Sequence, residues 1–207
     1  GSSGSLGKEL LKFKEYRFIK YKGDIRSKNK IRNWFKTNKF DAIFHLAAIV
    51  PIIDVNSNKK KAYDVNYNGT KNIVDEVKIH KIKWFFFSST SHVYASNKNK
   101  ISEKSICKPI SYYGYTKKKS EDYIIKNFKK SNIKYCIGRI FSTTNINQKK
   151  NYLIPDLKKK IQKSKKNIVL KNLNHYRDFI SMKDISKVIH ILLEKKFIGV
   201  INIGSGK

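Results

Sequence analysis

The chain has 207 residues, of which 40% are hydrophobic and 13% aromatic, so it can bury the core of one globular domain and is not expected to be disordered. Its formal net charge of +31 at pH 7 is typical of nucleic-acid-binding proteins. However, only five of the 46 basic residues are arginines, the residue type best suited to phosphate and base recognition. We therefore expect no specific nucleic-acid partner.

A membrane segment and a disulfide framework are both excluded by the residue pattern. The longest apolar stretch, 43–53, contains His45 and Pro51 and is far shorter than the roughly 20 residues that a bilayer requires. Cys107 and Cys136 are too few for a disulfide framework and have no metal-ligand spacing. The sequence predicts a cytoplasmic protein without a metal site.

Apolar runs of strand length alternate along the chain with segments of helical period, which is typical of β-α-β units and a parallel sheet. A short helix is expected around Leu6. The expected strands are 16–21, 42–46, 84–88 and 134–140, with shorter ones at 168–170 and 200–203. The further expected helices are 28–35, 63–77, 113–128, 153–161 and 181–193.

The chain begins with glycines at positions 1, 4 and 7, followed at once by an amphipathic helix. This spacing lets the backbone turn tightly and approach a dinucleotide pyrophosphate at the N-terminus of the helix. The letters Gly-Ser-Ser-Gly-Ser also occur in expression linkers, an alternative that the sequence leaves open. A true phosphate-binding turn follows a strand, so we expect the first strand of the sheet to be missing from these residues.

Hydroxyl groups gather at the end of the apolar run 84–94, which includes Thr90, and again at Tyr113-Gly-Tyr-Thr-Lys117. Tyr113 and Lys117 share one helix face because they are four residues apart. A phenol titrates near pH 10, and a neighbouring ammonium or an oxidised nicotinamide lowers that pKa. The pair is therefore a candidate acid/base, although Tyr115 and Lys119 have the same spacing.

Several motifs in order resemble those of the extended short-chain dehydrogenase/reductases, the NAD-dependent epimerase/dehydratase group that acts on nucleotide sugars. They include the glycine turn, Gly23-Asp-Ile-Arg26, His45-Leu-Ala-Ala48, Arg177-Asp-Phe-Ile180 and Asn202-Ile-Gly-Ser-Gly206. The resemblance covers essentially the whole chain. It implies a doubly wound Rossmann α/β fold, with a dinucleotide-binding domain in residues 1–141 and a small, incomplete substrate lobe in residues 142–207, interleaved with the last Rossmann elements.

The resemblance also implies roles for individual residues, and the Tyr-Gly-x-Thr-Lys form favours Tyr113 over Tyr115. The cofactor is NAD or NADP, and the substrate is a nucleotide sugar. The implied catalytic residues are Thr90, Tyr113, Lys117 and Asn66. The implied cofactor-binding residues are Gly1, Gly4, Leu6, Gly7, Asp24, Ile25, Ala47, Ala48, Tyr113 and Lys117, and the implied substrate-binding residues are Thr90, Ser142 and Arg177.

Departures from the family pattern narrow the expected reaction. Sugar 4,6-dehydratases usually have acidic residues directly after the catalytic threonine, where this chain has Ser91 and His92, and Ser142 replaces the usual asparagine. The interval from Gly7 to Asp24 has room for only one strand. The sequences of family members normally continue beyond the position that Lys207 has here. The residue that reads the ribose 2′-hydroxyl is not identifiable, so NAD and NADP both remain open.

These observations predict an NAD(P)-dependent nucleotide-sugar epimerase or 4-keto reductase, in which hydride transfer occurs at sugar C4 and a tyrosine moves the proton. The alternatives are a 4,6-dehydratase and a non-catalytic NAD(P)-binding Rossmann protein. A homodimer is compatible with the family resemblance.

Overall fold

The structure, a computed structural model, describes residues 1–50, 52–97, 99–145, 153–163, 168, 170 and 176–207. A four-stranded parallel sheet with the order β1-β2-β3-β6 forms its centre. Its strands are β1 (Ala42–His45), β2 (Trp84–Thr90), β3 (Lys134–Ile140) and β6 (Gly199–Ile203). A second parallel pair consists of β4 (Ser142–Thr144) and β5 (Phe179–Ser181).

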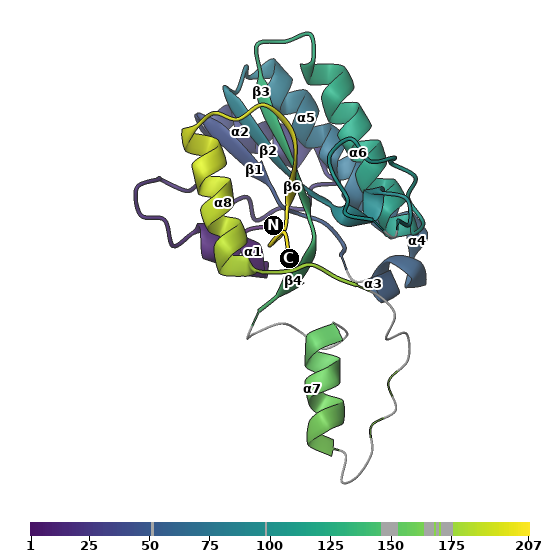
Figure 1. Cartoon of the computed structure of the whole chain (residues 1–207). Coiled ribbons are helices and arrows are strands. Elements are labelled where there is room, and N and C mark those ends of the chain that lie inside the picture. The colour runs from purple at the N-terminus through teal and green to yellow at the C-terminus, as the bar shows by residue number, and fades with distance from the viewer. Residues whose placement is uncertain (51, 98, 146–152, 164–167, 169, 171–175) are drawn as a thin grey trace.

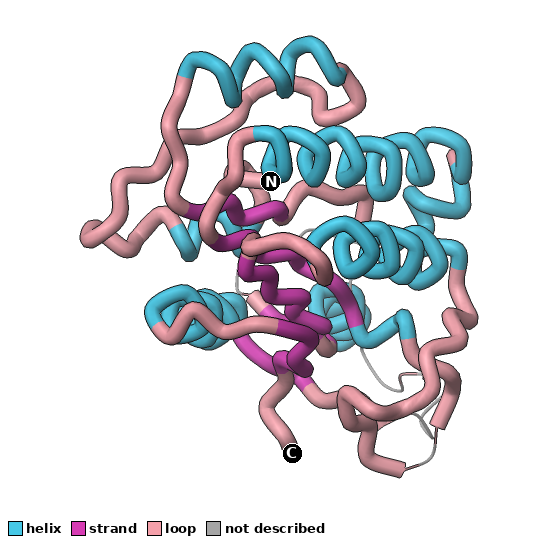
Figure 2. Tube along the Cα trace, turned by 90° about the horizontal axis from the view of Figure 1, so that it is seen from above, coloured by secondary structure: helices cyan, strands magenta, loops and turns pink. Residues whose placement is uncertain are grey.

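Helices cover both faces of the sheet (Figures 1 and 2). One face packs against α2 (Lys28–Thr37), α5 (Gly69–Ile79) and α6 (Tyr112–Phe128), and the other against α1 (Ser5–Leu10) and α8 (Met182–Glu194). Side chains of β2 alternate between the two cores. Burial on both faces explains why β2 is a continuous apolar run, and the expected doubly wound Rossmann α/β fold is confirmed.

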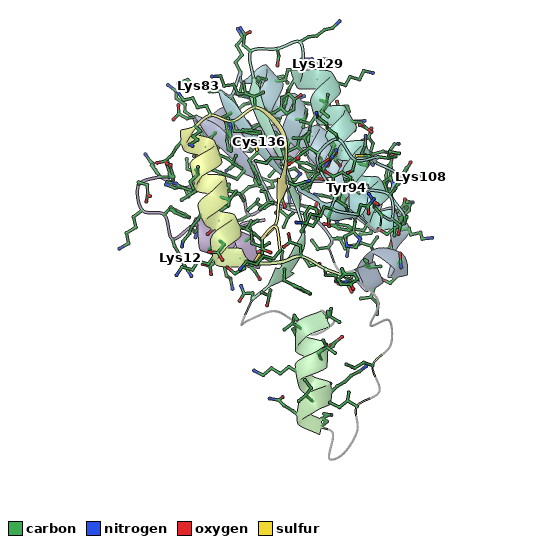
Figure 3. The ribbon with its side chains drawn as sticks, in the orientation of Figure 1. Lys12, Lys83, Tyr94, Lys108, Lys129 and Cys136 are labelled. Atoms are coloured by element: carbon green, nitrogen blue, oxygen red, sulfur yellow. The ribbon has the colours of Figure 1, made fainter. Side chains whose placement is uncertain are left out.

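Cys136 of β3 illustrates the depth of this core. Its side chain lies in the interior beneath α8 (Figure 3), and burial raises the pKa of its thiol to about 12. Such a thiol stays protonated at neutral pH.

The expected helix 63–77 is interrupted by a π-turn. The chain passes through α3 (Ile52–Ser57) and α4 (Lys59–Tyr63) into the π-helical turn Asp64–Asn68, which continues directly into α5. A further single turn of 3₁₀ helix, Ser91–Val93, follows β2. Helix α7 (Leu153–Lys163) lies apart from the sheet (Figure 1).

The expected strand 16–21 is wrong, because these residues form a loop. Its aromatic rings pack instead on other elements, Tyr16 on His190 of α8 and Phe18 on Phe44 of β1. A strand needs a neighbouring strand that accepts and donates its backbone hydrogen bonds. Within the described residues β1 pairs only with β2, so residues 16–21 have no strand beside them to pair with.

Two other expectations concern the sheet. Ile168 and Leu170 lie outside helices and strands, and Val169 lies outside the described residues, so the expected strand 168–170 is not observed. The expectation that a strand precedes Gly1 stays a prediction; Gly1 itself lies against the backbone of Leu46 at the carboxyl end of β1. None of the helices described here is long and apolar enough to cross a membrane.

Candidate active site

A cavity of about 1140 Å³ opens at the carboxyl ends of β1, β2 and β3, which is where open α/β sheets bind ligands. It brings together residues that are distant in the sequence. Of the predicted site residues, its wall contains Gly1, Gly4, Leu6, Gly7, Ala48, Thr90, Tyr113, Ser142 and Arg177.

The glycine turn packs closely on the end of β1. Gly4 is the N-cap residue of α1, and its N–H donates to Gly1 O at 3.1 Å. A Cβ atom on Gly7 would overlap Gly1 O, and one on Gly1 would overlap the backbone of Leu46. The backbone therefore occupies space that any side chain would need, as a close-approach turn requires.

The N-terminus of α6 determines which tyrosine faces the cavity. Ser111 caps this helix by accepting a hydrogen bond from Gly114 N at 3.1 Å. Tyr113 is 7% exposed and lines the cavity, whereas Tyr115 is 42% exposed and lies at a separate surface depression. Lys119, the partner of Tyr115 in the alternative spacing, donates to Tyr63 Oη at 2.8 Å.

Lys117 follows Tyr113 by four residues on α6, is buried with 2% of its surface exposed, and is not among the residues of the described cavity wall. Its ammonium nitrogen lies 4.0 Å from the centroid of the Phe87 ring, within the range of a cation–π interaction. Burial lowers the pKa of Lys117 to about 7, and the carboxylate of Glu121 opposes that change. The amine therefore titrates near neutral pH.

Asn66 is buried in the π-turn and fixes the segment that follows β1. Its side chain accepts from Ile49 N at 2.8 Å and donates to Ile49 O at 3.1 Å and to Thr116 Oγ1 at 3.2 Å. Thr116 in turn donates to Tyr113 O at 2.8 Å. Asn66 thus joins the loop after β1 to the first turn of α6. Its position in a π-turn fits a role at this site, because π-turns are frequent at functional sites.

His45, at the end of β1, contacts the same π-turn through Thr70. The Thr70 hydroxyl donates to Asn66 O at 2.6 Å, so the proton in its 2.8 Å contact with His45 must come from Nε2 of the histidine. Burial first, and then the positive charges of Lys117 and the amino terminus, lower the pKa of His45 well below its usual value. The imidazole is therefore neutral.

Arg177 is exposed and lines the cavity together with Ser142. The neighbouring carboxylate of Asp178 accepts hydrogen bonds from Ser205 N at 2.7 Å and Gly206 N at 2.8 Å. Within the described part of the chain no ion pair joins Arg177 to Asp178, so the guanidinium is not neutralised by its neighbour.

His92 also lines the cavity, and its ring meets the Tyr113 ring edge to face with 5.8 Å between centroids. Burial, and then the charge of Arg177, lower the pKa of His92. A neutral imidazole thus stands at one of the two positions where dehydratases usually carry acidic residues.

Besides Lys117, three predicted cofactor residues do not line the cavity. Asp24 pairs with Arg26 on the surface, and Ile25 packs in the core against Gly69. Ala47 is a partly buried neighbour of the same core. In the described residues these side chains are thus not brought to the cavity wall.

Sequence reasoning missed a buried ionic group beside the site. Glu121 of α6 pairs with Arg139 of β3, with 2.7 Å between Nη2 and Oε2, and also contacts Ser89 of β2. The sequence signal that could have identified Glu121 is its position four residues after Lys117, which places an acidic residue on the face of α6 that carries the candidate acid/base.

Known proteins are similar to this chain over most of its length. The family model described as NAD dependent epimerase/dehydratase family matches residues 5–204. The chain is 29% identical to a dTDP-D-glucose 4,6-dehydratase of Dictyostelium discoideum over 93% of its own length and 47% of that protein. It is also 29% identical to a GDP-6-deoxy-D-talose 4-dehydrogenase of Aggregatibacter actinomycetemcomitans, over 94% of its length and 69% of that protein.

Solved structures share the fold. UDP-glucose 4-epimerase of Thermus thermophilus, in complex with NAD, aligns with a TM-score of 0.85 at 15% identity, over 100% of this chain and 76% of that one. RMD from Pseudomonas aeruginosa, complexed with NADPH, aligns with a TM-score of 0.86 at 20% identity and the same coverage. The matched family model extends over nearly the whole chain, which therefore belongs to the NAD-dependent epimerase/dehydratase family, whose members are enzymes.

Proposed function

We propose that the protein is an NAD(P)-dependent nucleotide-sugar 4-epimerase or 4-keto reductase. The observation that carries this proposal is that Thr90, Tyr113 and Arg177 line one cavity with the glycine turn. Three different parts of the chain thereby bring a proton-transfer group, a hydroxyl and a cation to the same space.

The cavity wall fits a dinucleotide. The glycine turn has no room for a Cβ atom at Gly1 or Gly7, and Gly4 lies at the N-terminus of a helix, where a pyrophosphate is favoured. Ala48 and Tyr113 would contact the remainder of the molecule. When bound, NAD or NADP supplies hydride transfer.

Tyr113 is proposed to move the proton of the sugar O4 hydroxyl. Thr90 donates a hydrogen bond to the same oxygen, which orients C4 in the cavity. The Lys117 ammonium favours the phenolate of Tyr113 by its charge, and Asn66 holds the first turn of α6 through Thr116.

The substrate is proposed to be a sugar linked to a nucleoside diphosphate. The exposed guanidinium of Arg177 can bind a diphosphate with two parallel hydrogen bonds, and Ser142 lies in the same wall. Relatives named for UDP-, dTDP- and GDP-linked sugars support this substrate class without selecting the nucleotide.

A 4,6-dehydratase is the second candidate, favoured by the similarity to the Dictyostelium discoideum protein. That reaction also needs a group that removes a carbon-bound proton. In the described cavity wall His92 is a neutral candidate for this role, whereas Ser91 is not basic.

The experiment incubates the protein with UDP-, dTDP-, GDP- and CDP-linked hexoses in the presence of NAD or NADP, and with the corresponding 4-keto sugars in the presence of NADH or NADPH. Thermal stabilisation identifies the bound pair, and NMR of the products separates the reactions. An inverted C4 centre identifies an epimerase, and a 4-hydroxyl formed from a 4-keto sugar identifies a reductase. A 4-keto-6-deoxy product identifies the dehydratase, and stabilisation without turnover of any sugar contradicts the proposal.

A further inference from the structure

A buried carboxylate beside the candidate active site has no role in the proposed reaction. Glu121 is 0% exposed and follows Lys117 by four residues on α6. Residues at this spacing lie on the same face of a helix. The face of α6 that carries Tyr113 and Lys117 therefore also carries an acid that solvent does not reach.

The carboxylate is held rigidly by the sheet. Nε of Arg139 donates to Oε1 at 3.1 Å and Nη2 donates to Oε2 at 2.7 Å, while the Ser89 hydroxyl donates to Oε1. Two parallel bonds from one guanidinium fix both the position and the plane of a carboxylate. Burial lowers the pKa of Arg139, but Glu121 and Tyr94 together raise it above its usual value, so Arg139 stays charged.

Further hydrogen bonds fix Arg139 in turn. Its Nη1 donates to Tyr94 Oη at 2.9 Å, and that hydroxyl donates to Asn202 Oδ1 of β6 at 2.6 Å. Figure 3 shows Tyr94 near α6. Residues of β2, β3, β6 and α6 thus hold one carboxylate in one place.

Apart from the phenolate form of Tyr113, the other charged or titratable groups on the described neighbouring elements do not supply a negative charge to Lys117. His45 on β1 is neutral, the amino group of Gly1 is positive when charged, and Arg139 on β3 is paired with Glu121. Tyr113 on α6 is a phenol that carries a proton in one of its two working states. Glu121 is the anion that opposes the loss of the Lys117 proton.

We propose that Glu121 is a positioning residue for the active-site cation: its carboxylate, held by Arg139 and Ser89, keeps the buried amine of Lys117 protonated. The inference rests on the proposed function, in which the Lys117 ammonium assists Tyr113, and on the role in cofactor binding that the family resemblance implies for Lys117. The Glu121 carboxylate therefore stabilises two buried cations, the structural guanidinium of Arg139 and the active-site ammonium of Lys117.

The test needs variants that separate charge from folding. Glu121→Gln leaves two buried cations without an anion, which is strongly destabilising. Glu121→Gln combined with Arg139→Met removes the whole ion pair, a change that folded proteins tolerate far better. Glu121→Asp keeps the charge. Asp122→Asn is the matched control, because Asp122 is the next residue on α6, is exposed and pairs with Lys118.

Cofactor affinity is measured by fluorescence titration with NAD and NADP between about pH 5 and about pH 9, a range that spans the titration of Lys117. The wild-type affinity should fall as Lys117 loses its proton. In both Glu121→Gln variants the midpoint of that fall should move to lower pH, because the carboxylate that opposes the loss of the Lys117 proton is removed. Glu121→Asp and Asp122→Asn should keep a midpoint near that of the wild type.

Unfolding in urea over the same pH range gives a second readout that does not depend on the cofactor. The pH at which stability begins to rise should be lower in the Glu121→Gln/Arg139→Met variant than in the wild type, and Lys117→Met should lack this rise. If the double variant has the wild-type pH dependence in both measurements, the inference is wrong even though Lys117 keeps its role. If Lys117→Met leaves cofactor affinity unchanged, the role assigned to Lys117 in the proposed function is wrong. The unfolding profiles still decide, in that case, whether Glu121 controls the protonation of Lys117.

Discussion

Tyr113 and Tyr115 are separated by about 200° around α6, and only the first lines the cavity. We predict that Tyr113→Phe lowers turnover by about 10²–10⁴, the scale of a lost general acid/base. Cofactor affinity should change little because the ring remains. Tyr115→Phe, measured in the same steady-state assay, should keep wild-type turnover, and the reverse pattern would show that the wrong tyrosine has been assigned.

Lys117 should make the stability of the protein depend on pH. Its pKa is about 7 in the folded chain and near 10.5 when exposed, so between these values the unfolded chain binds the proton that the folded chain has lost. Stability therefore rises with pH through this window, by about 1.4 kcal/mol per pKa unit of separation. Urea unfolding of wild type and Lys117→Met should show the rise in the wild type only; parallel profiles would contradict the assigned burial.

Single residues were predictable where their chemistry depends on local spacing. Tyr113 and Lys117 stand one helical turn apart, and Thr90 ends an apolar strand, so the sequence alone brings them to one edge of a sheet. The pairing of Glu121 with Arg139 depends instead on how α6 lies across β3. Packing between elements of this kind leaves no periodic signal in the chain.

At the scale of elements, Thr70 joins β1 to the π-turn. We predict that Thr70→Val lowers the free energy of unfolding by about 1–3 kcal/mol, because Nε2 of His45 loses its acceptor in the core. The carbonyl of Asn66, in contrast, keeps the hydrogen bond from the Ser120 hydroxyl. Thr37→Val is the matched control, since the Thr37 hydroxyl bonds to Asn33 O at the surface of α2. Its effect in the same urea titration should stay within about 0.5 kcal/mol, and equal losses would contradict the importance of the buried contact.

Elements were predictable where both faces of the sheet are buried. β2 begins in the sequence with the apolar run 84–87, β3 is mostly apolar apart from Lys134 and Arg139, and α8 has one apolar helix face. The segment 16–21 has similar composition, but its rings pack on α8 and β1 while its backbone lacks a neighbouring strand among the described residues. The π-turn went unseen because one additional residue in a helical turn barely alters the apolar period.

At the scale of the whole molecule, the positive charge is spread over the surface. Lys12, Lys83, Lys108 and Lys129 project from different sides of the chain (Figure 3). We predict weak nucleic-acid binding that falls steeply with salt through counterion release. Fluorescence anisotropy with two unrelated duplexes should give equal affinities at every salt concentration. Discrimination between the duplexes at physiological salt would show a dedicated binding site instead.

The face of α6 that packs on the sheet also limits where residues can be inserted into or deleted from this helix. Tyr113, Lys117 and Glu121 recur every four residues, so each sits close to the same line along the helix. Inserting or deleting one residue between them would rotate everything beyond that point by about 100°. Substitutions on the solvent face of α6 leave this alignment intact, whereas a change of one codon in length would turn the carboxylate at position 121 away from Arg139.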